Sequence, residues 1–257
     1  MRILAIGDIF GKTGRRVIQK YLPQIKKERQ IDLVVANVEN TTHGKGITYK
    51  HYQELKSYGI DIMTSGNHIF NCEETQKFIS QVPDLLRPLN SNPLHPGIGT
   101  TLIQVKDKKV RITNLLGTTF MAMNAENPYL TLEKTFDQAQ GDIHLVDFHA
   151  ETTAEKNALA LHYDGKVSVV WGTHTHVQTA DERILPQGTG FITDLGMTGP
   201  YGGVIGAKLE VIIRRNKYGL PAKMAPHEDN GQFNGVIFEF DPLSNRVINI
   251  QRIRKIF

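Results

Sequence analysis

Residues 3–11 read Ile3-Leu4-Ala5-Ile6-Gly7-Asp8-Ile9-Phe10-Gly11, a short apolar strand that ends in a glycine-bearing turn with an acidic residue. A helix is expected from about Thr13 to Arg29, because apolar residues recur there at helical spacing. A second apolar strand follows at Leu33–Val38. The alternation continues with a helix at 48–58, a strand at 60–64 and a helix at 73–80. This pattern predicts parallel strands joined by right-handed crossovers, with helices covering the faces of the sheet.

The rest of the sequence predicts a second, more antiparallel sheet. Apolar runs at 99–105 and 110–116 flank Lys106–Lys109, which is typical of a hairpin turn. The later elements are expected to be a helix at 132–140, a strand at 143–148, a helix at 152–161, a strand at 167–171 and a closing hairpin of 235–240 with 246–253. We therefore expect one α/β domain over residues 1–257, built from two packed sheets.

Composition and charge exclude several classes of protein. Hydrophobic residues make up 40% of the 257 residues and charged residues 22%, as in soluble globular proteins. No apolar run reaches the roughly 18 residues that a membrane span requires, and the first apolar run is too short for a signal peptide. The lone Cys72 excludes an internal disulfide and a cysteine-based zinc site. These features predict a cytoplasmic protein without a membrane partner, and the net charge of +4 is compatible with an anionic substrate.

Polar side chains follow five of the predicted strands, at the carboxyl ends where open α/β sheets bind their ligands. Because these ends would face one crevice, the coincidence is more telling than any one motif. The residues are Asp8, Glu39, Asn40, Asn67, His68, His149, His174 and His176.

The chemistry of this set indicates two metal ions. Without His68, the set has two carboxylates, two carboxamides and three imidazoles and no thiolate, which suits manganese, iron or zinc better than calcium or magnesium. Seven ligands are too many for one ion that keeps a position open for substrate, but they suit two ions that share a carboxylate. Two ions about 3.5–4 Å apart bind phosphate oxygens and activate a water, which is the chemistry of a phosphoesterase.

Each motif also has a simpler explanation. Asp8 could cap the following helix, Glu39 and Asn40 could belong to a turn, and the histidine pair 174 and 176 could lie in a polar turn. His68 could be a proton donor, a ligand or a hydrogen-bonding residue. Residues 7–13 mimic a phosphate-binding P-loop, but three residues separate the two glycines where that motif requires four, so a P-loop NTPase is a minor alternative.

Two loops near these strand ends have open roles. Residues 41–46, with Lys45, could meet a substrate phosphate or form a surface loop. Residues 199–203 could form a structural turn or the mouth of the site.

The motifs resemble those of the calcineurin-like metallophosphoesterases. The ordered matches are Asp8, Gly66-Asn67-His68, His149 and Gly172-Thr173-His174-Thr175-His176. The sequence departs from the superfamily pattern in having Phe10 where a histidine is usual and Val38-Glu39-Asn40 where Gly-Asp is usual. Both departures resemble a bacterial branch, the YmdB-type family, whose members begin Gly-Asp-Ile/Val-x-Gly and carry Glu-Asn and Gly-Asn-His in this order. The match covers nearly the whole chain.

The resemblance implies a four-layer α/β/β/α sandwich, in which two mixed sheets are flanked by helices. It also implies that Asp8, Glu39, Asn40 and His176 hold one metal ion, and that Glu39 bridges to a second ion completed by Asn67, His149 and His174. His68 would stand beside the metals and donate a proton to the leaving alkoxide. Family members use iron or manganese, and zinc is a further candidate; Phe10 leaves the first ion with oxygen-rich ligation.

The function implied is a metal-dependent phosphodiesterase that uses a metal-bridging hydroxide and acts on small phosphodiesters. The resemblance suggests 2′,3′-cyclic nucleotides as substrates. The alternative is a non-catalytic or barely catalytic regulator that binds a nucleotide or RNA at the same metal site. RNA and a second copy of the chain are therefore open as partners.

Overall fold

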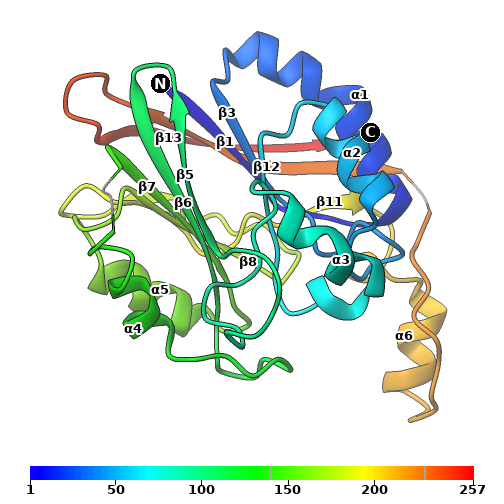
Figure 1. The fold of residues 1–257 in the computed structure, drawn as a ribbon. Coiled ribbons are helices and arrows are strands. Elements are labelled where there is room, and N and C mark those ends of the chain that lie inside the picture. The colour runs from blue at the N-terminus through cyan, green and yellow to red at the C-terminus, as the bar shows by residue number, and fades with distance from the viewer. Residues whose placement is uncertain (139–140, 229) are drawn as a thin grey trace.

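The computed structural model describes residues 1–138, 141–228 and 230–257. Its elements are arranged as two β-sheets packed face to face, with helices on the outer side of each (Figure 1). The elements up to residue 81 are β1 (Arg2–Ile6), β2 (Asp8–Ile9), α1 (Gly11–Arg29), β3 (Leu33–Asn37), α2 (Tyr49–Ser57), β4 (Ile62–Thr64), α3 (Glu73–Phe78) and the short 3-10 helices η1 (Ile69–Asn71) and η2 (Ile79–Gln81).

The first sheet has seven strands in the order β2-β11-β12-β1-β3-β4, with β13 paired to β12. Strands β1, β3 and β4 are parallel, as the opening alternation predicts. The antiparallel part comes from the end of the chain, where β11 (Met197–Pro200), β12 (Gly231–Phe240) and β13 (Val247–Ile256) join the sheet. The N-terminal strand therefore pairs directly with the C-terminal hairpin.

The second sheet has six strands in the order β5-β6-β7-β8-β10-β9. Its four central strands are parallel, and only the outer pairs β5–β6 and β9–β10 are antiparallel. The expectation of a more antiparallel second sheet is therefore wrong: the predicted hairpin forms only one edge of a mixed sheet. Its strands are β5 (Thr100–Val105), β6 (Lys108–Leu116), β7 (Ile143–His149), β8 (Val169–Thr173), β9 (Arg183–Ile184) and β10 (Gly190–Ile192), and the remaining helices are α4 (Pro128–Glu133), α5 (Thr153–His162) and α6 (Leu209–Asn216).

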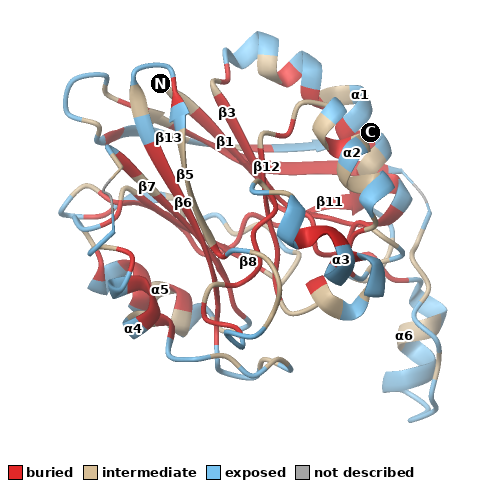
Figure 2. Ribbon diagram, in the orientation of Figure 1, coloured by how far each residue is buried: buried red, intermediate tan, exposed pale blue. Residues whose placement is uncertain are grey.

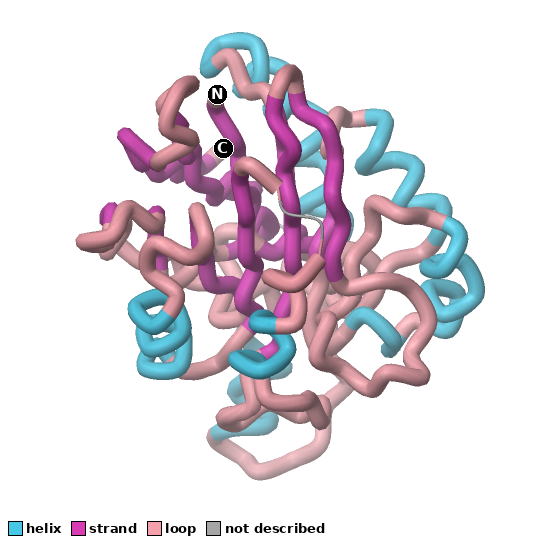
Figure 3. The backbone as a smooth tube through the Cα atoms, turned by 60° about the vertical axis from the view of Figure 1, so that its left-hand side comes forward, coloured by secondary structure: helices cyan, strands magenta, loops and turns pink. Residues whose placement is uncertain are grey.

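Three apolar layers hold the four layers of backbone together. Side chains alternate across a strand, so Leu4 and Ile6 of β1 pack under α1, whereas Ile3 and Ala5 pack between the sheets. On β7, Phe148 packs under α5. Burial is accordingly concentrated in the strands (Figure 2), and the view turned by 60° shows the strands inside and helices outside (Figure 3). The predicted four-layer sandwich is confirmed.

Most predicted elements lie within two or three residues of the observed ones, but one helix is wrong. The helix expected at 132–140 is instead α4, Pro128–Glu133, and residues 139–140 lie outside the described part of the chain. The shift follows from local chemistry: the Asn127 side chain accepts hydrogen bonds from the first N–H groups of α4, and Pro128 starts it. The short strands β9, β10 and β11 and the exposed helix α6 were not predicted.

No helix in the described ranges has the length and hydropathy to cross a membrane.

A close backbone contact fixes the turn that carries Asp8. A Cβ atom on Gly7 would lie 1.9 Å from the carbonyl oxygen of Gly196. The Asp8 N–H donates to that same oxygen at 3.0 Å, and Asp8 pairs with Met197 in register. Only glycine permits this approach, so the position of Asp8 depends on the contact.

We expect Gly7→Ala to destabilise the protein by about 3 kcal/mol, because the added methyl group must push the backbone at residue 196 away. The measurement is urea unfolding followed by circular dichroism. Gly219→Ala is the control, since its added Cβ meets nothing within 4 Å and adds only the cost of a positive φ of 64°, about 1 kcal/mol. Equal losses in the two variants would contradict the contact's importance.

Candidate metal centre

All seven predicted ligands lie at one edge of the sandwich, where the carboxyl ends of parallel strands from both sheets meet. The first sheet supplies Asp8 from β2, Glu39 and Asn40 after β3, and Asn67 after β4; the second supplies His149 from β7, with His174 and His176 after β8. Glu39, Asn40, His149 and Asp8 are buried. The sequence therefore predicted which segments the fold brings together, and their role as ligands stays a prediction.

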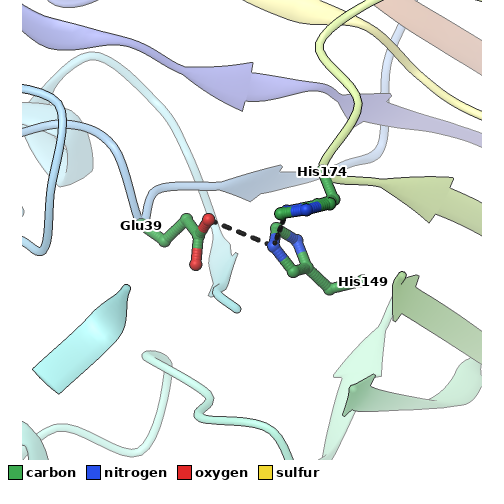
Figure 4. A group of neighbouring side chains, drawn as sticks. All are labelled: Glu39, His149 and His174. Carbon is green, nitrogen blue, oxygen red and sulfur yellow. Dashed lines mark hydrogen bonds and ion pairs between the residues drawn. The ribbon is translucent and has the colours of Figure 1, made fainter. Parts of the chain in front are cut away.

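Glu39, His149 and His174 form the tightest group, in which one ligand atom of each lies within 4.8 Å of the others (Figure 4). His149 Nε2 lies 3.1 Å from Glu39 Oε1, 3.1 Å from Asn67 Oδ1 and 3.0 Å from His174 Nδ1. A ring nitrogen carries at most one proton, so it cannot satisfy three polar neighbours by hydrogen bonding. The convergence of these atoms fits a shared metal ion.

Asp8, Asn40 and His176 form a second group beside the first. His176 Nε2 lies 3.2 Å from Asn40 Oδ1 and 3.8 Å from Asp8 Oδ1. Asp8 is fully buried, and its Oδ1 has no hydrogen-bond partner among the described residues. A buried carboxylate oxygen without a partner is costly, and a cation at this point would remove that cost.

Gly66 keeps the space between these groups open. A Cβ atom at this position would lie 2.2 Å from His149 Nε2 and 2.5 Å from Glu39 Oε2. The glycine before Asn67 is therefore part of the site, since any side chain would displace the two ligands. Taken with the unpartnered oxygen of Asp8, the residues fit a pair of transition-metal ions.

Each histidine has an outer partner that sets which ring nitrogen faces the centre. His176 Nδ1 donates to the Ile205 carbonyl at 2.9 Å, which leaves Nε2 for a metal. His149 Nδ1 donates to Thr173 Oγ1 at 2.9 Å, and the Thr173 hydroxyl donates to Asp147 Oδ1 at 2.7 Å. Such outer partners orient metal-binding histidines and raise their affinity.

His174 is turned the other way. Its Nδ1 faces His149, while its Nε2 lies 2.9 Å from Glu151 Oε2. Asp147 and Glu151 were missed in the sequence, although they flank His149 at a distance of two residues on either side. Their spacing places all three on one side of an extended segment, and that was the signal available.

Burial and mutual contact shift the pKa values of these groups. Burial opposes ionisation of Glu39, but the His149 imidazole and the His68 N–H outweigh it and hold the pKa of Glu39 below its usual range. Burial would lower the pKa of His149, but Glu39 and Asp8 raise it above its usual range. Burial and the neighbouring His149 lower the pKa of His174 to about 3, so its ring is neutral, as a ligand must be.

The loop that carries His174 and His176 has a strained backbone and is anchored by a buried ion pair. Both residues have positive φ values, 100° and 65°, which cost energy in residues other than glycine. Between them, Thr175 donates its N–H and its hydroxyl to Asp194 Oδ2 at 3.2 and 2.8 Å. Asp194 is paired with Lys156 Nζ at 2.7 Å, and both side chains are fully buried. This ion pair anchors the loop.

The simpler explanation is wrong for Asp8. Helix α1 begins after Phe10 without a side-chain cap, and Asp8 Oδ2 instead accepts the His174 N–H at 3.2 Å. Glu39 and Asn40 do lie in a turn, in which the Thr41 N–H donates to the Val38 carbonyl at 3.1 Å, but both side chains are buried. The half-buried His68 lies beside the cluster, and its backbone N–H donates to Glu39 Oε2 at 2.9 Å.

A cavity of about 1090 Å³ opens over the cluster. Residues 42–45 line it, so the loop after Asn40 forms a wall of the site. Residues 199–203 do not line it; β11 ends there, and Ile205 and Ala207 lie at the wall instead. The far side carries Arg215 of α6 and residues 223–226. Phe10 stands edge-on to His176, with ring centroids 5.7 Å apart, and also lines the cavity.

Comparison with known proteins places this site among phosphoesterases. The family model described as "YmdB-like protein" matches residues 4–253. The chain is 42% identical over 255 residues to the 2′,3′-cyclic-nucleotide 2′-phosphodiesterase of Bacillus subtilis (strain 168), covering 98% of this chain and 96% of that protein.

Two solved structures are similar over the full length of this chain. One, described as a novel phosphatase from Mycoplasma pneumoniae, has a TM-score of 0.95, 42% identity and coverage of 100% of this chain and 93% of that one. The other, a hypothetical protein from Thermus thermophilus, has a TM-score of 0.95, 34% identity and coverage of 100% and 99%.

We expect Glu39→Gln to weaken manganese binding by at least about 100-fold, beyond the roughly 10- to 100-fold that outer-shell partners control, because the carboxylate predicted to bridge two ions would lose its charge. Titration calorimetry with Mn²⁺ measures this. Glu28→Gln, which neutralises an exposed carboxylate of helix α1, is the matched control. Unchanged affinity and stoichiometry in Glu39→Gln would exclude a bridging role.

The outer partner of His149 gives a second test. Thr173→Val keeps the shape of the side chain but removes the hydroxyl between His149 and Asp147, so we expect manganese affinity to fall about 10- to 100-fold. Thr173→Ser restores the hydroxyl and should keep affinity close to that of the wild type. If Val and Ser variants bind manganese equally, the hydroxyl does not orient His149.

Proposed function

Because the chain belongs to the YmdB-like protein family, we propose that it is a metal-dependent phosphodiesterase that hydrolyses 2′,3′-cyclic nucleotides. The observation that carries the proposal is the convergence of seven candidate ligand side chains from both sheets. Four of them, Glu39, Asn40, His174 and His176, line one cavity together with the half-buried His68. The Bacillus subtilis relative, named as a 2′-phosphodiesterase of these compounds, supports the substrate.

The ligand set supports two metal ions. Asp8, Glu39, Asn40 and His176 would hold one, and Glu39 would be shared with a second ion held by Asn67, His149 and His174. When bound, such ions neutralise phosphate charge and lower the pKa of a water, which then loses a proton and becomes a nucleophile toward phosphorus. The mixture of oxygen and imidazole donors favours iron or manganese, with zinc as a further candidate.

His68 is suited to protonate the leaving oxygen. Its N–H is tied to Glu39, which fixes the backbone next to the cluster, while its ring lines the cavity. Burial lowers the pKa of His68, so the ring is a stronger acid when it is protonated and is less often protonated at neutral pH. Cleavage of the 2′ ester would leave a nucleoside 3′-phosphate.

The cavity walls fit a nucleotide. Phe10, Met224 and Pro226 offer apolar surface for a base and sugar, while Lys45 and Arg215 offer positive charge for phosphate oxygens. Ligand sites of this kind combine a mostly apolar lining with a few placed polar groups.

The test compares two substrates, 2′,3′-cyclic AMP and bis(p-nitrophenyl) phosphate, in protein stripped with a chelator and resupplied with manganese. Activity should vanish and return with the metal. In His68→Ala we expect kcat for the cyclic nucleotide to fall about 10²- to 10⁴-fold, with little loss on the nitrophenyl ester, whose leaving group needs no proton. His162→Ala, on the surface helix α5, is the control.

Manganese binding must be measured in each variant. Metal bound without hydrolysis of either substrate would overturn the proposal in favour of a regulator that binds nucleotides without turnover. Equal losses on both substrates in His68→Ala would show that His68 is not the proton donor.

A further inference from the structure

A second cleft opens on the other side of His68. Its volume is about 410 Å³, within the range of small-ligand sites. Lys45, His68 and Asn71 line both this cleft and the larger cavity. The two hollows therefore meet beside the candidate metal centre, with His68 at their junction.

The walls of this cleft suit a nucleobase. Phe70, in the 3-10 helix η1 directly after His68, and His95 form an aromatic pair with ring centroids 4.7 Å apart. Met123 adds a polarisable thioether on the opposite loop. Aromatic side chains bind bases by stacking, whatever their sequence.

The His95 ring is held in place. Its Nδ1 lies 3.3 Å from Ser91 Oγ, which in turn accepts a hydrogen bond from Arg87 Nη1 at 3.2 Å. Burial and the nearby Arg87 lower the pKa of His95, so the ring is neutral near pH 7 and can contact a base without a charge.

A cyclic nucleotide does not use two clefts, because both ester oxygens of its phosphate belong to one ribose. A linear phosphodiester between two nucleosides has a substituent on each side of phosphorus. We propose that the smaller cleft is a second nucleoside subsite, and that the protein also hydrolyses linear dinucleotides. This inference rests on the proposed function and names a further substrate class for the same site.

The reaction balances with water alone. The oxygen of water bonds to phosphorus, the bond from phosphorus to the 5′-oxygen of the second nucleoside breaks, and that oxygen takes a proton from His68. The proton released by water replaces the one that His68 gave up. The first nucleoside keeps a 3′-phosphate in the larger cavity, and the second leaves with a free 5′-hydroxyl from the cleft that Phe70 and His95 line.

The experiment measures kcat and KM of the manganese-loaded protein for adenylyl-(3′→5′)-adenosine and for 2′,3′-cyclic AMP. The wild type should convert the dinucleotide to adenosine 3′-phosphate and adenosine. Phe70→Leu, which keeps apolar volume but loses the stacking face, should raise KM for the dinucleotide about tenfold and change KM for the cyclic nucleotide less than twofold. Phe70→Tyr should restore the wild-type value.

Phe257→Leu is the matched control, because Phe257 also belongs to an aromatic pair, with Tyr21 at 3.4 Å, and does not line either hollow. Hydrolysis of the cyclic nucleotide without any hydrolysis of the dinucleotide would overturn the second subsite and leave the proposed function standing. An equal rise in KM for both substrates in Phe70→Leu would show that the cleft binds the nucleoside common to both, and it would also overturn the second subsite. Failure of both substrates would overturn the proposed function and this inference with it.

Discussion

The contact between the Glu39 carboxylate and the His149 imidazole joins the two sheets at their functional edge. Glu39 follows β3 of the first sheet and His149 ends β7 of the second, and their ligand atoms lie 3.1 Å apart with both side chains buried. Neither group could be buried alone, because the desolvation of an unpaired charge costs several kcal/mol. The same contact therefore helps to pack the two sheets and to assemble the cluster of candidate ligands.

Contacts in the surrounding structure hold the side chains of this cluster in position. Glycines at 7 and 66 allow backbone and ligands to approach more closely than any side chain would permit. The buried Lys156–Asp194 pair ties down the strained loop of His174 and His176. Thr173, Glu151 and the Ile205 carbonyl each fix the ring nitrogen that faces away from the cluster. Ligand geometry is thus set by contacts one step removed from the metal site.

Local patterns in the sequence were enough to predict the strands and helices that bury a regular apolar face. The strand at 3–6 is an uninterrupted apolar run, and those at 33–38 and 143–148 are apolar except for Asn37, His144 and Asp147. Buried parallel strands have that appearance. The helix predicted at 132–140 failed because an Asn-Pro start at residues 127–128 outweighed the apolar spacing further on. Strands β9 to β11 span only 2 to 4 residues each, and elements that short are defined by their partners and carry no periodicity of their own.

The sequence by itself determined the chemistry of the candidate ligands and the edge at which they gather, because the carboxyl ends of parallel strands must meet on one side of a sheet. Only the tertiary structure decided which nitrogen of each histidine faces the cluster, that Asp8 keeps an unpartnered oxygen there, and that two hollows meet at His68. Those features depend on contacts between residues such as Asn40 and His176, 136 positions apart. Their geometry follows from packing between the sheets, which no local pattern encodes.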